Sequence, residues 1–82
     1  MVSFKEIRYD DKKIVAKAGH YCLPGKVFNV VIDRESGDVT TNPTIDEESL
    51  YEVEIRKASW VILYRLNEWD GKLDEEEYVN WG

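Results

Sequence analysis

The stretch TIDEESLYEVEIRKASWVILYRLNEW, residues 44–69, decides the fold, because its pattern fits either one long helix or β-strand. Thr44 and Glu47 have the spacing of a capping box, which is typical of a helix start. Apolar residues then recur at steps of three and four, and at about 100° per residue they fall within a sector of roughly 80°. This stripe, which we expect to be buried in the core, consists of Tyr51, Ile55, Ala58, Ile62, Leu66 and Trp69.

A strand remains the alternative for residues 50–66. The letters YEVEIR alternate between apolar and charged, and WVILY is rich in residues that favour strands. However, neither glycine nor proline interrupts residues 44–69, so no turn is available to divide the segment. The pattern therefore favours one helix over residues 45–69.

A second apolar group lies on the back of this predicted helix. Val53, Trp60 and Tyr64 project away from the stripe. Large apolar side chains on that side are either covered by another segment or form a contact surface. We expect cover from the end of the chain, where the candidates are Leu73, Tyr78, Val79 and Trp81. If they stay bare, Val53, Trp60 and Tyr64 could instead pair two copies as a homodimer.

The residues before this segment predict two β-hairpins. Strands at 3–9 and 12–18 flank Asp10-Asp11, and a slip in the alternation between Phe4 and Ile7 indicates either a bulge or a late strand start. Strands at 27–33 and 38–41 flank a turn that contains Gly37. The whole chain, residues 1–82, thus predicts one α+β domain. It has an antiparallel sheet of three to four strands packed on the long helix, with a short C-terminal helix over about 74–81.

Charge is unevenly distributed along the chain. Residues 1–34 carry seven basic and four acidic side chains, a net of +3, whereas residues 35–82 carry four and thirteen, a net of −9, which together give −6. The acidic part repels phosphate backbones and attracts basic surfaces, so direct nucleic-acid binding is not expected. No apolar run approaches the roughly 20 residues that span a bilayer. The first residues do not resemble a secretion signal, and the single cysteine, Cys22, favours a cytoplasmic location.

The stretch WDGKLDEEEYVNWG, residues 69–82, resembles the second half of an EF-hand calcium loop. With Gly71 at the invariant glycine position the loop would run over 66–77, and the resemblance implies a metal site. Its ligands would be Glu68, Asp70, Asp74 and Glu77. Leu66 occupies the first position, where the family has a carboxylate. The competing interpretation is a helix end at Asp70-Gly71, followed by a last helix capped by Asp74 and Glu77.

No enzymatic constellation is recognisable. His20 and Cys22 are too few to form a structural zinc site, and nothing in the sequence specifies a third group to orient them for catalysis. We expect Cys22 to be a small buried residue and His20 to be a surface or capping residue. Glycine-rich phosphate loops are absent from the sequence. No catalytic residue and no cofactor is therefore predicted.

These features predict a small acidic module that binds a protein partner with a basic surface. In its sharper form the module inhibits a nucleic-acid-binding protein by presenting carboxylates where that protein expects phosphates, as small phage and mobile-element proteins of similar size and charge do. Calcium binding through residues 66–77 is the alternative. The predicted contact residues are Trp60, Tyr64, Glu68, Asp70, Asp74, Glu75, Glu76, Glu77 and Trp81.

Overall fold

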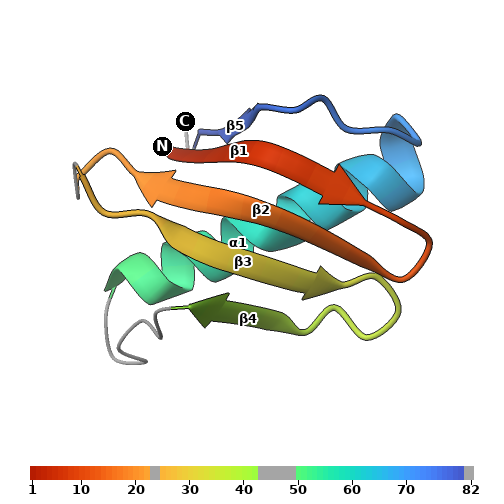
Figure 1. The fold of residues 1–82 in the computed structure, drawn as a ribbon, viewed down its shortest axis with the longest axis horizontal. Coiled ribbons are helices and arrows are strands. Elements are labelled where there is room, and N and C mark those ends of the chain that lie inside the picture. Colours follow the sequence, from red (N-terminus) through yellow and green to blue (C-terminus); the bar gives the residue numbers. More distant parts are fainter. Residues whose placement is uncertain (23–24, 43–49, 81–82) are drawn as a thin grey trace.

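The protein is a two-layer α+β domain in which one helix crosses one face of a five-stranded antiparallel sheet (Figure 1). The computed structural model describes residues 1–22, 25–42 and 50–80. The strands lie in the order β4-β3-β2-β1-β5. Their bounds are Val2–Tyr9 for β1, Lys13–His20 for β2, Phe28–Asp33 for β3, Val39–Asn42 for β4 and Glu77–Val79 for β5. The predicted fold class is confirmed, with one strand more than expected.

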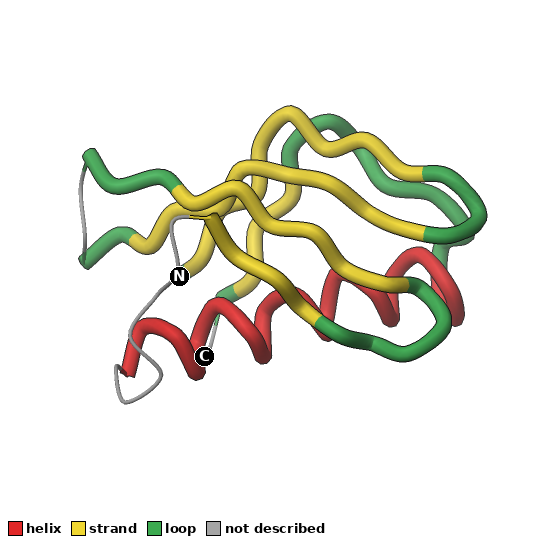
Figure 2. The backbone as a smooth tube through the Cα atoms, turned by 60° about the horizontal axis from the view of Figure 1, so that its bottom comes forward, coloured by secondary structure: helices red, strands yellow, loops and turns green. Residues whose placement is uncertain are grey.

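Both predicted hairpins are present, because alternating residues give the sheet one apolar face. In β2, Ile14, Ala16 and Ala18 are buried, while the residues between them are exposed. In β3, Phe28, Val30 and Ile32 are buried in the same way. The buried side chains of all strands but β4 form one core with the helix, and Val39 of β4 packs against that core. Figure 2 shows the helix on one side of the strands, with no other described helix or strand on the opposite side.

Of the two interpretations of the slip in alternation, the bulge is the one that the structure shows. The pairing of β1 with β2 shifts between Lys5 and Arg8, so two residues of β1 face one residue of β2. One of the two, Glu6, has a φ of 51°, which is the left-handed region. This turn of the backbone brings Ile7 back to the buried face. The bulge therefore preserves the core pattern at the cost of backbone strain.

The ambiguous central segment is helical. Helix α1 spans Leu50–Tyr64 and continues directly into a π-helical turn, η1, at Arg65–Trp69. Ile55, Ala58, Ile62 and Leu66 of the predicted stripe are buried against the sheet. The predicted start at residues 45–49 lies outside the described residues. No helix in the described parts of the chain is long and apolar enough to cross a membrane.

The predicted C-terminal helix over 74–81 is wrong in the described part of that range. Residues 77–79 form β5, which pairs antiparallel with β1 and sets Val79 opposite Val2. Just before β5, the Ile7 N–H donates to the Glu75 carbonyl oxygen at 3.1 Å. A strand is more favourable than a helix here for two reasons. It pairs the backbone groups of β1 that would otherwise be unpaired, and it buries Val79 in the core. Helix capping by Asp74 and Glu77 offers neither advantage.

Candidate protein-binding surface

An aromatic cluster lies exposed on the outer side of the helix. We define this aromatic cluster as Trp60, Tyr64 and Trp69, whose exposed fractions are 48%, 50% and 68%. With Lys57 and Val61 they line an open hollow of about 420 Å³. A smaller hollow of about 200 Å³ lies beside Trp60 and Tyr64 and reaches Glu68. Exposed aromatic side chains around a hollow are typical of the centre of a protein interface.

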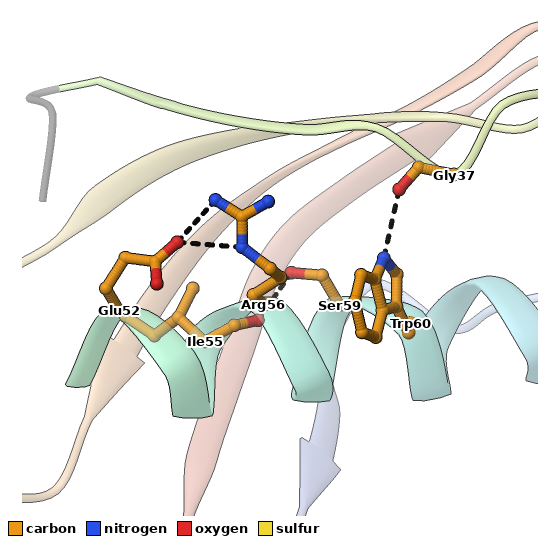
Figure 3. A network of polar contacts seen from close by, with 6 residues as sticks. All are labelled: Gly37, Glu52, Ile55, Arg56, Ser59 and Trp60. Carbon is orange, nitrogen blue, oxygen red and sulfur yellow. Dashed lines mark hydrogen bonds and ion pairs between the residues drawn. The ribbon is translucent and has the colours of Figure 1, made fainter. Parts of the chain in front are cut away.

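Trp60 is held in place by the sheet. Its indole Nε1–H donates to the carbonyl oxygen of Gly37, in the β3–β4 turn, at 3.0 Å. Figure 3 shows the ring extending from the helix toward this turn, beside the ion pair of Glu52 and Arg56. Because the polar end of the ring is satisfied within the chain, the rest of the ring is available for apolar contact. An anchored ring also loses little conformational entropy when a partner binds.

The π turn places Trp69 beside Tyr64. The Asp70 N–H donates to the Arg65 carbonyl oxygen at 2.7 Å, which closes a turn wider than that of an α-helix. Trp69 therefore leaves the core stripe, and its predicted burial is wrong. Its ring meets that of Tyr64 edge-on, with centroids 5.1 Å apart. The helical periodicity did not predict the exposure of Trp69, because it assumes the same rotation at every residue.

The predicted cover for the back of the helix is wrong for the described residues. Val79 belongs to the core, and Leu73 is partly buried against that core. Tyr78 pairs with Ser3 and is exposed, and its hydroxyl donates to Glu76. Trp81 lies outside the described residues. The back of the helix is thus left open at Trp60 and Tyr64, and Val53 is exposed as well but does not line either hollow.

The structure divides the predicted acidic contact residues into two groups. Glu68 and Asp70 are exposed at the end of the helix, next to the aromatic cluster. Asp74, Glu75 and Glu76 are exposed on the segment that leads into β5, at the edge of the sheet. Glu77 is directed inward instead, because its carboxylate lies 3.5 Å from the Arg65 guanidinium. In the described residues, no basic side chain lies within ion-pair distance of Glu68, Asp70, Asp74 or Glu75.

The structure does not assemble the predicted calcium ligands into a cluster. Among the described residues, no three His, Cys, Asp or Glu side chains are placed to hold a metal ion. Leu66, at the first position of the loop, is buried in the core, and Glu77 lies in β5. Gly71 has a φ of 68°, which matches a glycine that ends a helix.

The burial expected for His20 and Cys22 is reversed. His20 is buried and Cys22 is exposed. The imidazole Nδ1 accepts the Cys22 backbone N–H at 3.0 Å, and Nε2 faces the carboxylate of Glu54 on the helix. A hydrogen bond with the Cys22 thiol raises the pKa of Tyr21 beside it. Glu54 was missed because the sequence places it 34 residues away from His20.

Comparisons with protein-family models, with curated proteins and with solved structures found no match. The function must therefore be argued from the surface of the chain itself.

Proposed function

We propose that the chain is a non-enzymatic binding module that docks on a basic surface of a protein partner. The observation that carries the proposal is the aromatic cluster, in which Trp60 and Tyr64 are about half exposed and Trp69 is more exposed still, around an open hollow. Tryptophan and tyrosine in such a setting supply a large part of the affinity of protein interfaces. The neighbouring carboxylates of Glu68 and Asp70 determine the charge of the partner that this surface attracts.

The acidic residues beside the β5 edge of the sheet also favour a basic partner. Asp74, Glu75 and Glu76 are exposed, and they add to a net charge of −6. Carboxylates of this kind accelerate the encounter with a basic partner more than they hold the complex together. In its sharper form, the proposal is that the partner is a nucleic-acid-binding protein whose basic site the module occupies in place of phosphates. The net charge supports this form because it opposes direct binding of nucleic acid by the chain itself.

The test compares immobilised variants for the capture of basic proteins from a lysate. Trp69→Ala should lower the affinity for the retained partner by about 30-fold or more, which is the effect of losing an interface hot spot. Its matched control is Val53→Ala, which trims another exposed apolar residue of the same helix outside the hollows. Glu68→Lys combined with Asp70→Lys should slow association, and Asp11→Lys combined with Glu35→Lys controls for the same change in net charge.

Two outcomes decide between the forms of the proposal. Displacement of the retained partner by double-stranded DNA would support charge mimicry, whereas retention in excess DNA would leave only the general binding module. Equal capture by the wild type, by Trp69→Ala and by Glu68→Lys/Asp70→Lys would refute docking at this surface altogether.

A further inference from the structure

The two edges of the sheet differ in how well they are protected against strand pairing. The β5 edge is three residues long and is preceded by the exposed acids Asp74, Glu75 and Glu76. The β4 edge, Val39–Asn42, has the sequence VTTN, without charge, proline or bulge. Natural sheets normally protect their edges with charges, prolines or bulges. The β5 edge is the better protected of the two, because three exposed acids precede it while one exposed acid, Asp38, directly precedes β4, and Figure 1 shows no described strand beyond β4.

The hydrogen-bond pattern of the β3–β4 hairpin shows which groups of β4 face outward. The Asp33 N–H donates to the Asp38 carbonyl oxygen at 2.9 Å, so this pair is of the hydrogen-bonded type. Such pairs recur at every second position of an antiparallel ladder. Thr40, opposite Val31, is therefore directed toward β3. The N–H and C=O groups of Val39 and Thr41 are directed away from the sheet.

We propose that the β4 edge is a homodimer surface, on which β4 of a second copy pairs antiparallel about a two-fold axis at Thr40. Val39 of each copy then faces Thr41 of the other, and the two pairs exchange four backbone hydrogen bonds. Thr40 faces its own counterpart, and threonine pairs are favourable across strands. Asp38 faces Asn42, so this register sets no like charges opposite each other.

The neighbouring register with its axis at Thr41 is less favourable. If the axis passed through Thr41, Val39 would face residue 43, which is proline and has no N–H to donate. The other edge offers a shorter strand, and its seam would end beside the exposed acids Asp74, Glu75 and Glu76 of each copy. The second copy is thus the occupant that fits β4, because the free groups of this strand are complementary to themselves.

The arrangement goes beyond the proposed function and does not depend on it. A two-fold axis perpendicular to the sheet keeps both helices on the same face of one continuous sheet. Two aromatic clusters would then face the same side, which allows a dimer to bind a repeated partner more tightly than one copy can. The dimer is distinct from a helix-to-helix pairing through Val53, Trp60 and Tyr64.

Disulfide trapping tests the register directly, and it suits a seam this short, which is expected to be weak. In a Cys22→Ser background, Thr40→Cys places two thiols opposite each other in a non-hydrogen-bonded pair. There the Cα atoms are about 4.5 Å apart, within the range that a disulfide spans. The control is Asn42→Cys, which lies on the same face of the same strand but opposite Asp38 of the second copy. We expect mild oxidation to cross-link Thr40→Cys at least tenfold faster, and equal rates would overturn the proposal.

A charge-swap experiment gives an independent readout. Thr40→Lys and Thr40→Glu should each be monomeric in sedimentation at high protein concentration, and an equal mixture should restore the dimer. Asn29→Lys, on the same sheet face but in β3, should dimerise like the wild type.

The dependence on salt separates the dimer from the proposed docking. Because two copies of charge −6 repel each other, dimerisation should strengthen with salt, whereas docking on a basic partner should weaken. The seam would be refuted if the wild type stayed monomeric at high concentration in both low and high salt, and if hydrogen exchange at the Val39 and Thr41 amides did not slow with concentration. That result would leave the proposed function intact.

Discussion

At the scale of single residues, Glu6 is the one described non-glycine residue with a positive φ. Its side chain reaches Lys17 at 2.9 Å, and that ion pair lowers the pKa of Glu6. An exposed pair of this kind contributes little to stability. The conformation of Glu6 is thus imposed by the bulge, since no regular strand geometry would return Ile7 to the core.

This strain predicts an inverted order of two substitutions. Glu6→Ala and Glu6→Gly both remove the pair with Lys17, but only glycine adopts a positive φ without a steric cost. We expect Glu6→Gly to be more stable than Glu6→Ala by about 0.5 to 1 kcal/mol, although glycine is normally the weaker residue in a strand. Chemical denaturation of both variants measures the difference. A less stable glycine variant would contradict a strained bulge at this position.

Trp69 and His20 show the limit of what local residue patterns can predict. The helical spacing correctly placed Ile55, Ala58 and Ile62 in the core, because burial follows the period of an α-helix. Trp69 escaped that rule through a single wider turn. His20 is buried in phase with the buried apolar residues of β2, so the alternation accounts for its burial, but no local pattern records that the Glu54 carboxylate of the helix faces its ring.

At the scale of elements, the β3–β4 turn is stabilised by an ionised side chain. The Asp33 carboxylate accepts the N–H groups of Ser36 and Glu35 at 3.0 and 2.9 Å. These hydrogen bonds, with that from Ser36 the stronger contribution, hold the pKa of Asp33 below its ordinary value of 3.8. The same turn carries Gly37, whose carbonyl oxygen anchors Trp60. The turn thus supports the aromatic cluster as well as the sheet.

The lowered pKa predicts a stability that depends on pH. Because the folded pKa lies below the unfolded one, the contribution of Asp33 is complete above pH 3.8 and is lost as the pH falls through the folded pKa. Asp33→Ala should therefore lower the melting temperature at pH 7, and the gap to the wild type should narrow below about pH 4. Thermal melts from pH 7 to pH 2 check this. A gap that is constant over the range would show that the charge has no role in the turn.

At the scale of the whole molecule, Arg34 connects three segments that are distant in sequence. Its guanidinium donates to the Asp10 carbonyl oxygen at 2.6 Å and to Asn67 Oδ1 at 2.8 and 3.0 Å. The Asn67 amide returns a longer bond to the Arg34 carbonyl oxygen. The end of the helix is thereby tied to the turns of both hairpins. This contact positions the π turn that carries Trp69.

Removal of the Arg34 hydrogen bonds should lower the free energy of unfolding more than removal of a local ion pair does. Arg34→Ala should lower the free energy of unfolding by about 1 to 2 kcal/mol, since it deletes several hydrogen bonds from a charged donor. For a domain of this size each 1 kcal/mol corresponds to roughly 4 to 8 °C in melting temperature. Arg56→Ala is the matched control, because that arginine binds Glu52 of the same helix face and should cost about 0.5 kcal/mol. Equal shifts in melting temperature for the two variants would contradict the role assigned to Arg34.

The local patterns of the sequence determined the two hairpins, the position of the irregularity near Glu6 and the core face of the helix, because alternation and helical spacing act between neighbouring residues. Tertiary structure alone decided the rest. Residues 77–79 became a strand because β1 had an unpaired edge, and Trp69 became exposed because the helix ends in a π turn tied to Arg34. Both outcomes depend on hydrogen bonds between segments that lie far apart in the chain. The candidate surface needed both, since helical spacing placed Trp60 and Tyr64 outside the core and the tertiary contacts added Trp69 and left all three uncovered.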